Sequence, residues 1–299
     1  MEKTACVMAL GYFDSVHKGH KKVIAAAKEL AEALGVKTGV FTFGGDLASR
    51  FHKAGGMVFT LAEREKLLYE AGADFVYAAA CSDEFLSLDK REFLAFLTEK
   101  FDIRAFVCGF DYTFGRNGAG NAAFLREFSR AHKINAVIVP EMREDNVKIS
   151  TTEIKKRLAA GDVEGANALL GNAYFVTGTV VKDRGVGHSI GFPTVNLYPA
   201  AEKFPLKNAV YGGHVFVDGA KYNAIVNYGT RPTFGLGAPL TEAHLIGFDG
   251  DLYGKEIAVY FDFFLREIKK FESVNELKKQ LETDTQRTIL YDKIRAERQ

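Results

Sequence analysis

Strand-like and helix-like patterns alternate through the first half of the chain. Continuous apolar runs of strand length occur at residues 4–10, 39–43, 74–79, 105–109 and 136–140. Apolar residues recur at helical spacing in the segments between these runs, at residues 18–34, 62–71, 90–100 and 121–131. Strand and helix in turn predict a parallel sheet with helices on its faces, and strands that are apolar throughout are expected where both faces are covered. We therefore predict an α/β, Rossmann-like domain.

The second half of the chain has a different pattern. Two short helical pieces lie between residues 154 and 170, and then apolar and polar residues alternate with a period of two. These strand-like runs, punctuated by Gly and Pro, occupy residues 174–181, 210–217, 221–227, 242–249 and 256–265. They predict an antiparallel β-barrel or sandwich, and the helical spacing near the end predicts a C-terminal helix. We expect a domain at 1–158, a helical connector at 159–172 and a second domain at 173–299.

Composition places the chain among soluble globular proteins. It has 299 residues, 47% hydrophobic and 26% charged, with a net charge of +1, which is typical of about two domains. No basic excess indicates a nucleic-acid partner, and no apolar run reaches the ~18 residues of a membrane span. The cysteines, Cys6, Cys81 and Cys108, fit neither a disulfide framework nor a zinc pattern, so we expect a cytoplasmic protein. The sequence does not define an oligomeric state.

The stretch "LGYFDSVHKGH", residues 10–20, places two histidines between the first predicted strand and the first predicted helix. Open parallel sheets bind ligands beyond the carboxyl ends of their strands, and a helix N-terminus favours anions. His17 and His20 can share one face of the first turn, and Gly19 lets a phosphate approach the backbone. We therefore predict a phosphate site. Two alternatives remain: one histidine caps the helix while the other is solvated, or both bind zinc together with Asp14.

A second motif, "DRGVGHSIGFPTVNL", opens the second half. Gly185 and Gly187 do not form a dinucleotide fingerprint, because the third glycine is out of register and Pro193 stands where a helix should run. A glycine-lined phosphate loop remains possible for this stretch. Thr194 and Asn196 are two residues apart, so an extended segment points both oxygens to the same side, which suits magnesium. The alternative is an ordinary turn at a strand end.

The stretch "TEAHLIGF" contains a carboxylate, Glu242, on a strand that is otherwise apolar. A half-buried carboxylate near a phosphate site can accept the proton of an attacking hydroxyl. The alternative is an exposed glutamate on an edge strand.

The first motif, "GYFDSVHKGH", resembles the signature of the HxGH nucleotidyltransferases, and the whole chain resembles the bacterial bifunctional riboflavin kinase/FAD synthetase family. Further motifs occur in the family's order: "GFDYTFGRNGAGN", "ISTTEIKKRLAAGDVEGANALLG", "GFPTVN", "VNYGTRPTF", "TEAHLIGFDGDLYGKEI" and "LREIKKFESVNEL". The resemblance implies small-molecule substrates. The first domain would transfer AMP from ATP to FMN, giving FAD and pyrophosphate, and the barrel would phosphorylate riboflavin to FMN with ATP and Mg²⁺.

The resemblance also implies roles for single residues. His17 and His20 would be the adenylyl-transfer histidines, and Glu242 would be the base of the kinase. Thr194 and Asn196 would hold magnesium. Arg266 would lie near the flavin, although a solvated charge at a strand end is the alternative. The expected ATP and phosphate contacts are Gly11, Phe13, Asp14, Gly19, Asp111, Ser150, Thr151, Thr152, Lys155, Gly185 and Gly187.

The chain departs from the family pattern mainly in its first half. Lys155 stands where the "ISSTxIR" motif ends in arginine, and it lacks the bidentate fork that suits phosphate. Ser15 replaces a glycine, "TFGGDLASRF" replaces a "TFDPHP"-like run, and His188 replaces an arginine of the second half. These departures leave two alternatives to the bifunctional enzyme. One is a riboflavin kinase with a degenerate first domain, and the other is a non-catalytic flavin or nucleotide sensor.

Overall fold

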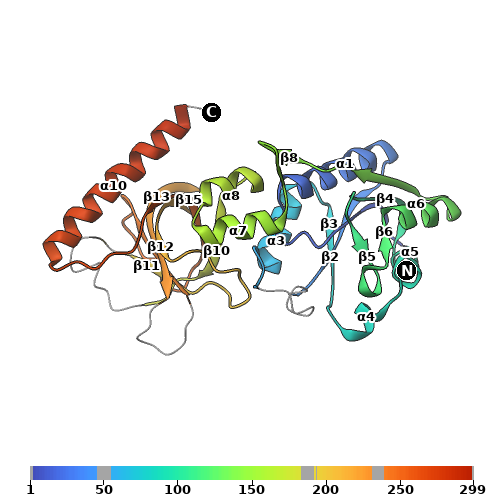
Figure 1. Ribbon diagram of the computed structural model, residues 1–299, viewed down its shortest axis with the longest axis horizontal. Helices are drawn as coiled ribbons and strands as arrows, with labels where there is room; N and C mark the ends of the chain where they lie inside the picture. The colour runs from blue at the N-terminus through green and yellow to red at the C-terminus, as the bar shows by residue number, and fades with distance from the viewer. Residues whose placement is uncertain (1–2, 46–54, 183–191, 193, 231–238, 298–299) are drawn as a thin grey trace. The chain divides into compact units, whose positions relative to one another are not determined.

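The computed structural model describes residues 3–45, 55–182, 192, 194–230 and 239–297. The chain divides into two compact units, Met1–Thr151 and Thr152–Gln299. Each unit has its own sheet (Figure 1).

The first unit is built on a five-stranded sheet in the order β3-β2-β1-β4-β7. Its strands are β1 (Ala5–Leu10), β2 (Lys37–Phe43), β3 (Phe75–Ala79), β4 (Asp102–Gly109) and β7 (Asn135–Val139). All neighbouring pairs are parallel, so the prediction of a parallel sheet is confirmed. The chain winds outward from β1 to β3 and then returns to β4 on the other side of β1. The turns after β1 and β4 therefore meet at the point where such sheets bind ligands.

The segments that connect the strands of this sheet form helices. They are α1 (Lys18–Leu34), α3 (Leu61–Glu70), α4 (Asp83–Ser87), α5 (Lys90–Lys100) and α6 (Ala122–Ala131). α1 ends at Gly35, whose left-handed backbone, with φ of 66°, suits glycine. Phe93 and Leu97 of α5 pack in one core cluster with Met8 and Leu10 of β1.

Two small hairpins of the first unit were not predicted from the sequence. They pair β5 (Thr113–Phe114) with β6 (Gly120–Asn121), and β8 (Arg143–Glu144) with β9 (Val147–Lys148). Each strand has two residues, which is too short for a hydrophobic period to show. Both hairpins lie after the strands that carry the candidate site.

The second unit begins with the two predicted helical pieces, α7 (Thr151–Ala160) and α8 (Val163–Leu170). A six-stranded antiparallel sheet follows, in the order β10-β15-β12-β13-β14-β11. Its strands are β10 (Tyr174–Thr179), β11 (Val195–Leu197), β12 (Ala209–Val217), β13 (Ala220–Thr230), β14 (Pro239–Leu245) and β15 (Glu256–Arg266). An antiparallel bridge joins Val181 to Asn196 and nearly closes the sheet into the predicted barrel.

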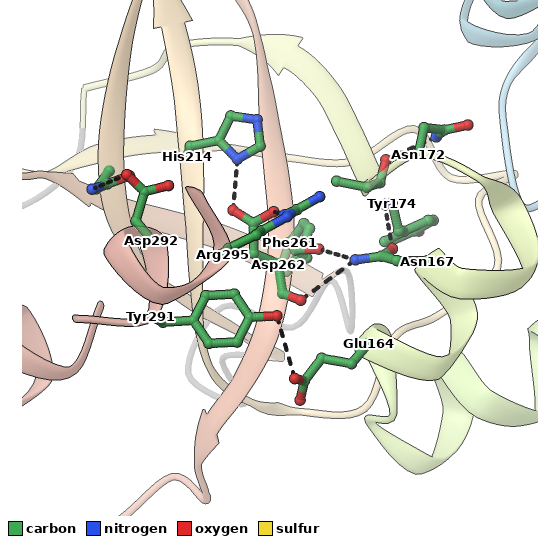
Figure 2. Close-up of polar contacts among 12 residues, drawn as sticks. Glu164, Asn167, Asn172, Tyr174, His214, Phe261, Asp262, Tyr291, Asp292 and Arg295 are labelled. Carbon is green, nitrogen blue, oxygen red and sulfur yellow. Dashed lines mark hydrogen bonds and ion pairs between the residues drawn. The ribbon is translucent and has the colours of Figure 1, made fainter. Parts of the chain in front are cut away.

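The predicted C-terminal helix is present as α10 (Val274–Glu297) and packs on the barrel. Figure 2 shows Asp262 of β15 between His214 and Arg295, with one carboxylate oxygen toward each. The His214 Nδ1 atom lies 2.6 Å from this carboxylate, and Arg295 donates to it at 2.7 Å. Tyr291 stacks on Phe263, with ring centroids 4.0 Å apart. These contacts fix α10 against β15.

Candidate active sites

The first candidate site is a cavity of about 400 Å³ at the carboxyl ends of β1 and β4. The turns after β1, β4, β7 and β9 form its wall. The predicted residues that line it are Gly11, Phe13, His17, Gly19, His20, Asp111, Ser150 and Thr151. Asp14, Thr152 and Lys155 are not among its described lining residues. The structure therefore brings together most of the nucleotide contacts that the sequence predicts for the first half.

The two histidines form a stacked pair at the start of α1. Their ring centroids are 3.6 Å apart, with 14° between the planes. His17 is the N-cap residue, and its Nδ1 atom accepts a hydrogen bond from the backbone N–H of His20 at 3.0 Å. Since Nδ1 is the acceptor, the neutral His17 ring carries its proton on Nε2 and can donate from there. The alternative in which one histidine caps the helix is thus true of His17, and both rings still line the cavity.

Both imidazoles are neutral at pH 7. Burial lowers the pKa of His17 from 6.5 to about 4, against the opposing effect of its own backbone hydrogen bond and of Asp111. Burial, followed by the neighbouring His17, lowers the pKa of His20 well below its usual value. The buried Nδ1 atom of His20 has no hydrogen-bond partner among the described residues. The pair therefore offers neutral hydrogen-bonding groups to an anion rather than a positive charge.

A strained turn connects β1 to the histidines. Phe13 and Val16 have φ of 51° and 40°, which is unusual for residues other than glycine and most of all for a β-branched one. The turn is held by Asp14, whose Oδ1 atom accepts a hydrogen bond from the N–H of Val58 at 2.8 Å. The hydroxyl groups of Ser15 and Thr151 lie 2.9 Å apart. Strain of this kind is often found at functional sites.

The zinc alternative finds no support in the structure. Across residues 3–45, 55–182, 192, 194–230 and 239–297, no group of three or more His, Cys, Asp or Glu side chains is placed to hold a metal ion. The Asp14 carboxylate is engaged with Val58, and Asp14 is absent from the cavity lining.

Arg64 supports the wall of this cavity, a role that the sequence reasoning missed. Its side chain is fully buried on α3 and donates to the carbonyl oxygen atoms of Tyr12 and Phe43, each at 2.9 Å. It therefore ties the turn after β1 to the end of β2. The signal in the sequence was its helical spacing with Leu61 and Leu68, which places Arg64 on the apolar face of the helix.

The second candidate site is a cavity of about 310 Å³ in the barrel unit. Thr194, Glu242 and Arg266 all line it. The Thr194 hydroxyl donates a hydrogen bond to Oε1 of Glu242 at 3.1 Å. Asn196 lies directly opposite Glu242 in the pairing of β11 with β14. The structure thus groups the predicted base with both predicted magnesium ligands.

Asn196 carries a buried polar atom of interest. Its Oδ1 atom has no hydrogen-bond partner among the described residues, although the residue is only 5% exposed. A buried carbonyl oxygen usually has a partner, since leaving it without one costs roughly 1–3 kcal/mol. A neutral oxygen beside a carboxylate and a hydroxyl is a donor set that suits a hard cation.

Arg266 lies at the wall of the same cavity and belongs to a buried ion pair. Its Nε and Nη2 atoms both lie 2.9 Å from Oδ2 of Asp284 on α10. The Asp284 side chain is fully buried, so this pair joins the end of β15 to α10. Arg266 is therefore not a solvated charge at a strand end. Its contact with a flavin stays a prediction.

Two predicted phosphate contacts, Gly185 and Gly187, lie outside the described residues, as does His188. Most of the departing "TFGGDLASRF" run lies outside them too.

Comparison with known proteins follows the division into two units. The sequence profile of the FAD synthetase family matches residues 1–153, and that of the riboflavin kinase family matches residues 170–291. A bifunctional riboflavin kinase/FMN adenylyltransferase of Bacillus subtilis is 33% identical over 97% of this chain and 93% of its own length. Proteins of the same name in Listeria monocytogenes and Escherichia coli are 32% and 29% identical, over 94% and 93% of this chain and 91% and 90% of their own lengths.

These findings define a two-domain transferase, a nucleotidyltransferase unit followed by a kinase unit. The chain belongs to the family of bifunctional riboflavin kinase/FMN adenylyltransferases, as its motifs predicted. Both domain families are present, which favours the bifunctional enzyme over a riboflavin kinase with a degenerate first domain.

A solved structure resembles nearly all of the chain. A crystal structure from Streptococcus pneumoniae, described as a macrolide-efflux protein, has a TM-score of 0.87 and 31% identity, covering 96% of this chain and 95% of its own. In the part of the present chain that the structure describes, no helix has the length and apolar character needed to cross a bilayer.

Proposed function

We propose that the chain makes FMN and then FAD at two separate sites. The second unit transfers a phosphoryl group from ATP to riboflavin, and the first unit transfers AMP from ATP to FMN, releasing pyrophosphate. The observation that carries the proposal is that each unit holds its own site. His17 and His20 line one cavity, and Glu242 with Thr194 lines another.

In the first unit, the proposed role of the histidines is to stabilise charge on the α-phosphate. A phosphate oxygen of FMN attacks the α-phosphorus of ATP, and the bond to the bridging oxygen of the β-phosphate breaks. Neutral imidazoles can donate hydrogen bonds to the oxygen atoms on which charge builds, and fixed donors of this kind are a major source of catalysis. Gly19 supports their placement, because a Cβ atom there would lie 3.0 Å from Cε1 of His17.

Other residues of the first unit are proposed as nucleotide contacts. Ser150 and Thr151 stand at the start of α7, where hydroxyl groups and the backbone N–H groups of a first helical turn favour phosphate. The remaining proposed contacts are Gly11, Phe13, Asp14, Asp111, Thr152 and Lys155.

In the second unit, Glu242 is the proposed general base. Its carboxylate would accept the proton of the riboflavin hydroxyl as that oxygen attacks the γ-phosphorus of ATP. Thr194 orients the carboxylate through the 3.1 Å hydrogen bond. Positioning and charge stabilisation carry most of the catalysis in phosphoryl transfer. Arg266 is proposed to contact the flavin, and Gly185 and Gly187 to contact phosphate.

We further propose that Thr194 and Asn196 hold Mg²⁺ with the ATP phosphates. The buried Oδ1 atom of Asn196, which lacks a hydrogen-bond partner among the described residues, supports this role. When bound, the ion would neutralise the negative charge of the phosphates.

The cell compartment and the domain limits also remain proposals. Cys6, Cys81 and Cys108 are free thiols, which suits the reducing cytoplasm. The proposed limits are 1–158 and 173–299 with a connector at 159–172. Limited proteolysis that cuts inside either domain before the connector would contradict these limits.

One assay tests the proposed function. The protein is incubated with riboflavin, ATP and Mg²⁺, and the flavins are separated by chromatography over time. FMN that appears first and is then converted to FAD is the expected result. FMN alone would support a degenerate first domain, and no product would support a sensor.

A further inference from the structure

The described residues that line the cavity of the first unit include few charged side chains. The ligands of the proposed reaction, ATP and FMN, are strongly anionic. The two imidazoles are neutral at pH 7, since their pKa values are lowered. The described residues that line the cavity include one basic side chain other than histidine, Lys148, and two carboxylic side chains, Asp111 and Glu141. Among the described lining residues, Lys148 is thus the one lysine or arginine that can meet the phosphates.

Lys148 is placed at the cavity by the hairpin of β8 and β9. It ends β9, two residues before Ser150 and three residues before the start of α7. Its Nζ atom lies 2.8 Å from Oδ2 of Asp111, 3.9 Å from Oε2 of Glu141 and 4.8 Å from the ring centroid of Phe110. Its charge also acts on His17, since it contributes to the lowered pKa of that ring. The ammonium group therefore lies at the same wall as the predicted phosphate contacts.

The ion pair of Lys148 with Asp111 is easily exchanged. Its side chains are 40% and 57% exposed, and exposed pairs of this kind contribute little to stability. The triphosphate of ATP carries several negative charges, whereas Asp111 carries one, so its oxygen atoms attract the ammonium group more strongly than the carboxylate does. A phosphate that enters the cavity can therefore take the ammonium group from the carboxylate.

We propose that Lys148 binds the phosphates of ATP during FAD formation. To do so, its ammonium group breaks the ion pair with Asp111. The assignment to ATP rests on the proposed function of this site. The phosphate contact itself rests on the position and charge of Lys148. Lys148 and the N-terminus of α7 together supply positive potential where the pyrophosphate departs.

Lys18 provides a matched control. It lies in the same "HKGH" stretch and forms an ion pair of the same length, 2.8 Å, with Glu144. Its side chain is 32% exposed, close to the 40% of Lys148. Lys18 is not among the described lining residues of the cavity. Removing its charge therefore reproduces the electrostatic change without touching the proposed contact.

The experiment compares Lys148→Met, Lys148→Arg and Lys18→Met in the full chain. FAD formation from supplied FMN is measured at varied ATP and at varied FMN, and FMN formation from riboflavin is measured in parallel. Lys148→Met should raise the KM for ATP about 10- to 100-fold, as expected from losing one charge-assisted hydrogen bond. The KM for FMN and the kinase reaction should not change, Lys148→Arg should recover part of the loss, and Lys18→Met should resemble the wild type. A KM for ATP within twofold of wild type, or a rise confined to FMN, would overturn the proposal.

A second measurement needs no turnover. Binding of inorganic pyrophosphate is followed by calorimetry for the wild type, Lys148→Met and Lys18→Met. The first variant should lose about 10-fold or more in affinity at one site, and the second should lose none. If the wild type forms no FAD but Lys148→Met still weakens pyrophosphate binding, the proposed function fails and the phosphate site stands. Equal affinity of all three proteins for pyrophosphate would contradict the proposed phosphate contact of Lys148.

Discussion

The side-chain hydroxyl of Ser15 lies 2.9 Å from that of Thr151. This contact joins the turn after β1 to the first residue of α7, across 136 positions of the sequence. Ser15 is fully buried, at a position where the resemblance described above predicts glycine. The Ser15 hydroxyl group therefore has a hydrogen-bond partner in the structure. That partner, Thr151, is one of the predicted phosphate contacts, and the hydrogen bond holds it in place.

Ser15→Ala should raise the KM for ATP in FAD formation about fivefold, since a typical hydrogen bond contributes ~1 kcal/mol. Thr151→Val should have at least that effect, and the double variant should cost less than the sum of the two single variants. FMN formation from riboflavin serves as the internal control. Strict additivity of the two substitutions would show that the hydroxyl groups are not coupled.

The lowered pKa values of the histidines predict an acid-sensitive first unit. An unfolded His17 takes up a proton near pH 6.5, whereas the folded one does so at about pH 4, so unfolding is favoured as the pH falls between these values. At ~1.4 kcal/mol for each tenfold difference in proton affinity, the gap from 6.5 to about 4 corresponds to roughly 3 kcal/mol. The stabilisation is fully present above pH 6.5.

The test uses His17→Asn, which keeps an N-cap acceptor and removes the titrating ring. Urea unfolding of both proteins is measured at several pH values from 7 to 4.5. The wild type should lose more unfolding free energy than the variant over this range. Parallel pH profiles would mean that the ring is not shielded from protonation.

Much of the fold could be predicted from local patterns. The first helix is one case, because the capping histidine and Gly35 mark its two ends, and the predicted 18–34 matches α1 at Lys18–Leu34. The parallel sheet was predicted from the continuous apolar runs of the first half, and the barrel from the alternation of apolar and polar residues in the second half. β11 was not predicted, since its three residues, Val195–Leu197, are too few to show a period.

The sites could be predicted only in part. Residues that follow strands of one parallel sheet meet at one edge, so the grouping of His17 with Asp111 follows from topology. Arg64 and Lys148 were missed because their importance lies in long-range contacts. Lys148 meets Asp111 across 37 positions, and no local pattern encodes such a contact.

Arg64→Met should weaken the first unit and FAD formation together. The substitution keeps an apolar stem but removes the donor to the Phe43 carbonyl oxygen and one of two donors to that of Tyr12, which still accepts from the Thr42 hydroxyl at 2.7 Å. A buried group left unsatisfied costs about 1–3 kcal/mol, so we expect the unfolding free energy to fall by about this amount. Lys66→Met is the control, because Lys66 lies exposed on the same helix. Equal stability of the two variants would contradict the role given to Arg64.

Asp284→Asn should destabilise the barrel unit and raise the KM for riboflavin. The substitution leaves the Arg266 guanidinium, which is 16% exposed, beside a neutral partner. Removing one member of a buried ion pair typically costs about 3–5 kcal/mol. Asp292→Asn on the same helix breaks the more exposed pair with Lys221 and should cost about 0–1 kcal/mol. Thermal unfolding and the KM for riboflavin are measured for both variants. Similar losses of stability in the two variants would contradict the greater importance given to the Arg266–Asp284 pair.

The central claim is that two separate sites carry the two reactions, and two variants test it most directly. FMN formation from riboflavin and FAD formation from supplied FMN are measured for the wild type, His20→Ala and Glu242→Gln. His20→Ala should lower FAD formation by about 100- to 1,000-fold, the usual cost of losing one fixed donor, and leave FMN formation intact. Glu242→Gln should lower FMN formation by about 100- to 10,000-fold, as is typical for a general base, and still convert supplied FMN to FAD. Loss of both reactions in either folded variant, or unchanged FMN formation in Glu242→Gln, would contradict the two-site assignment.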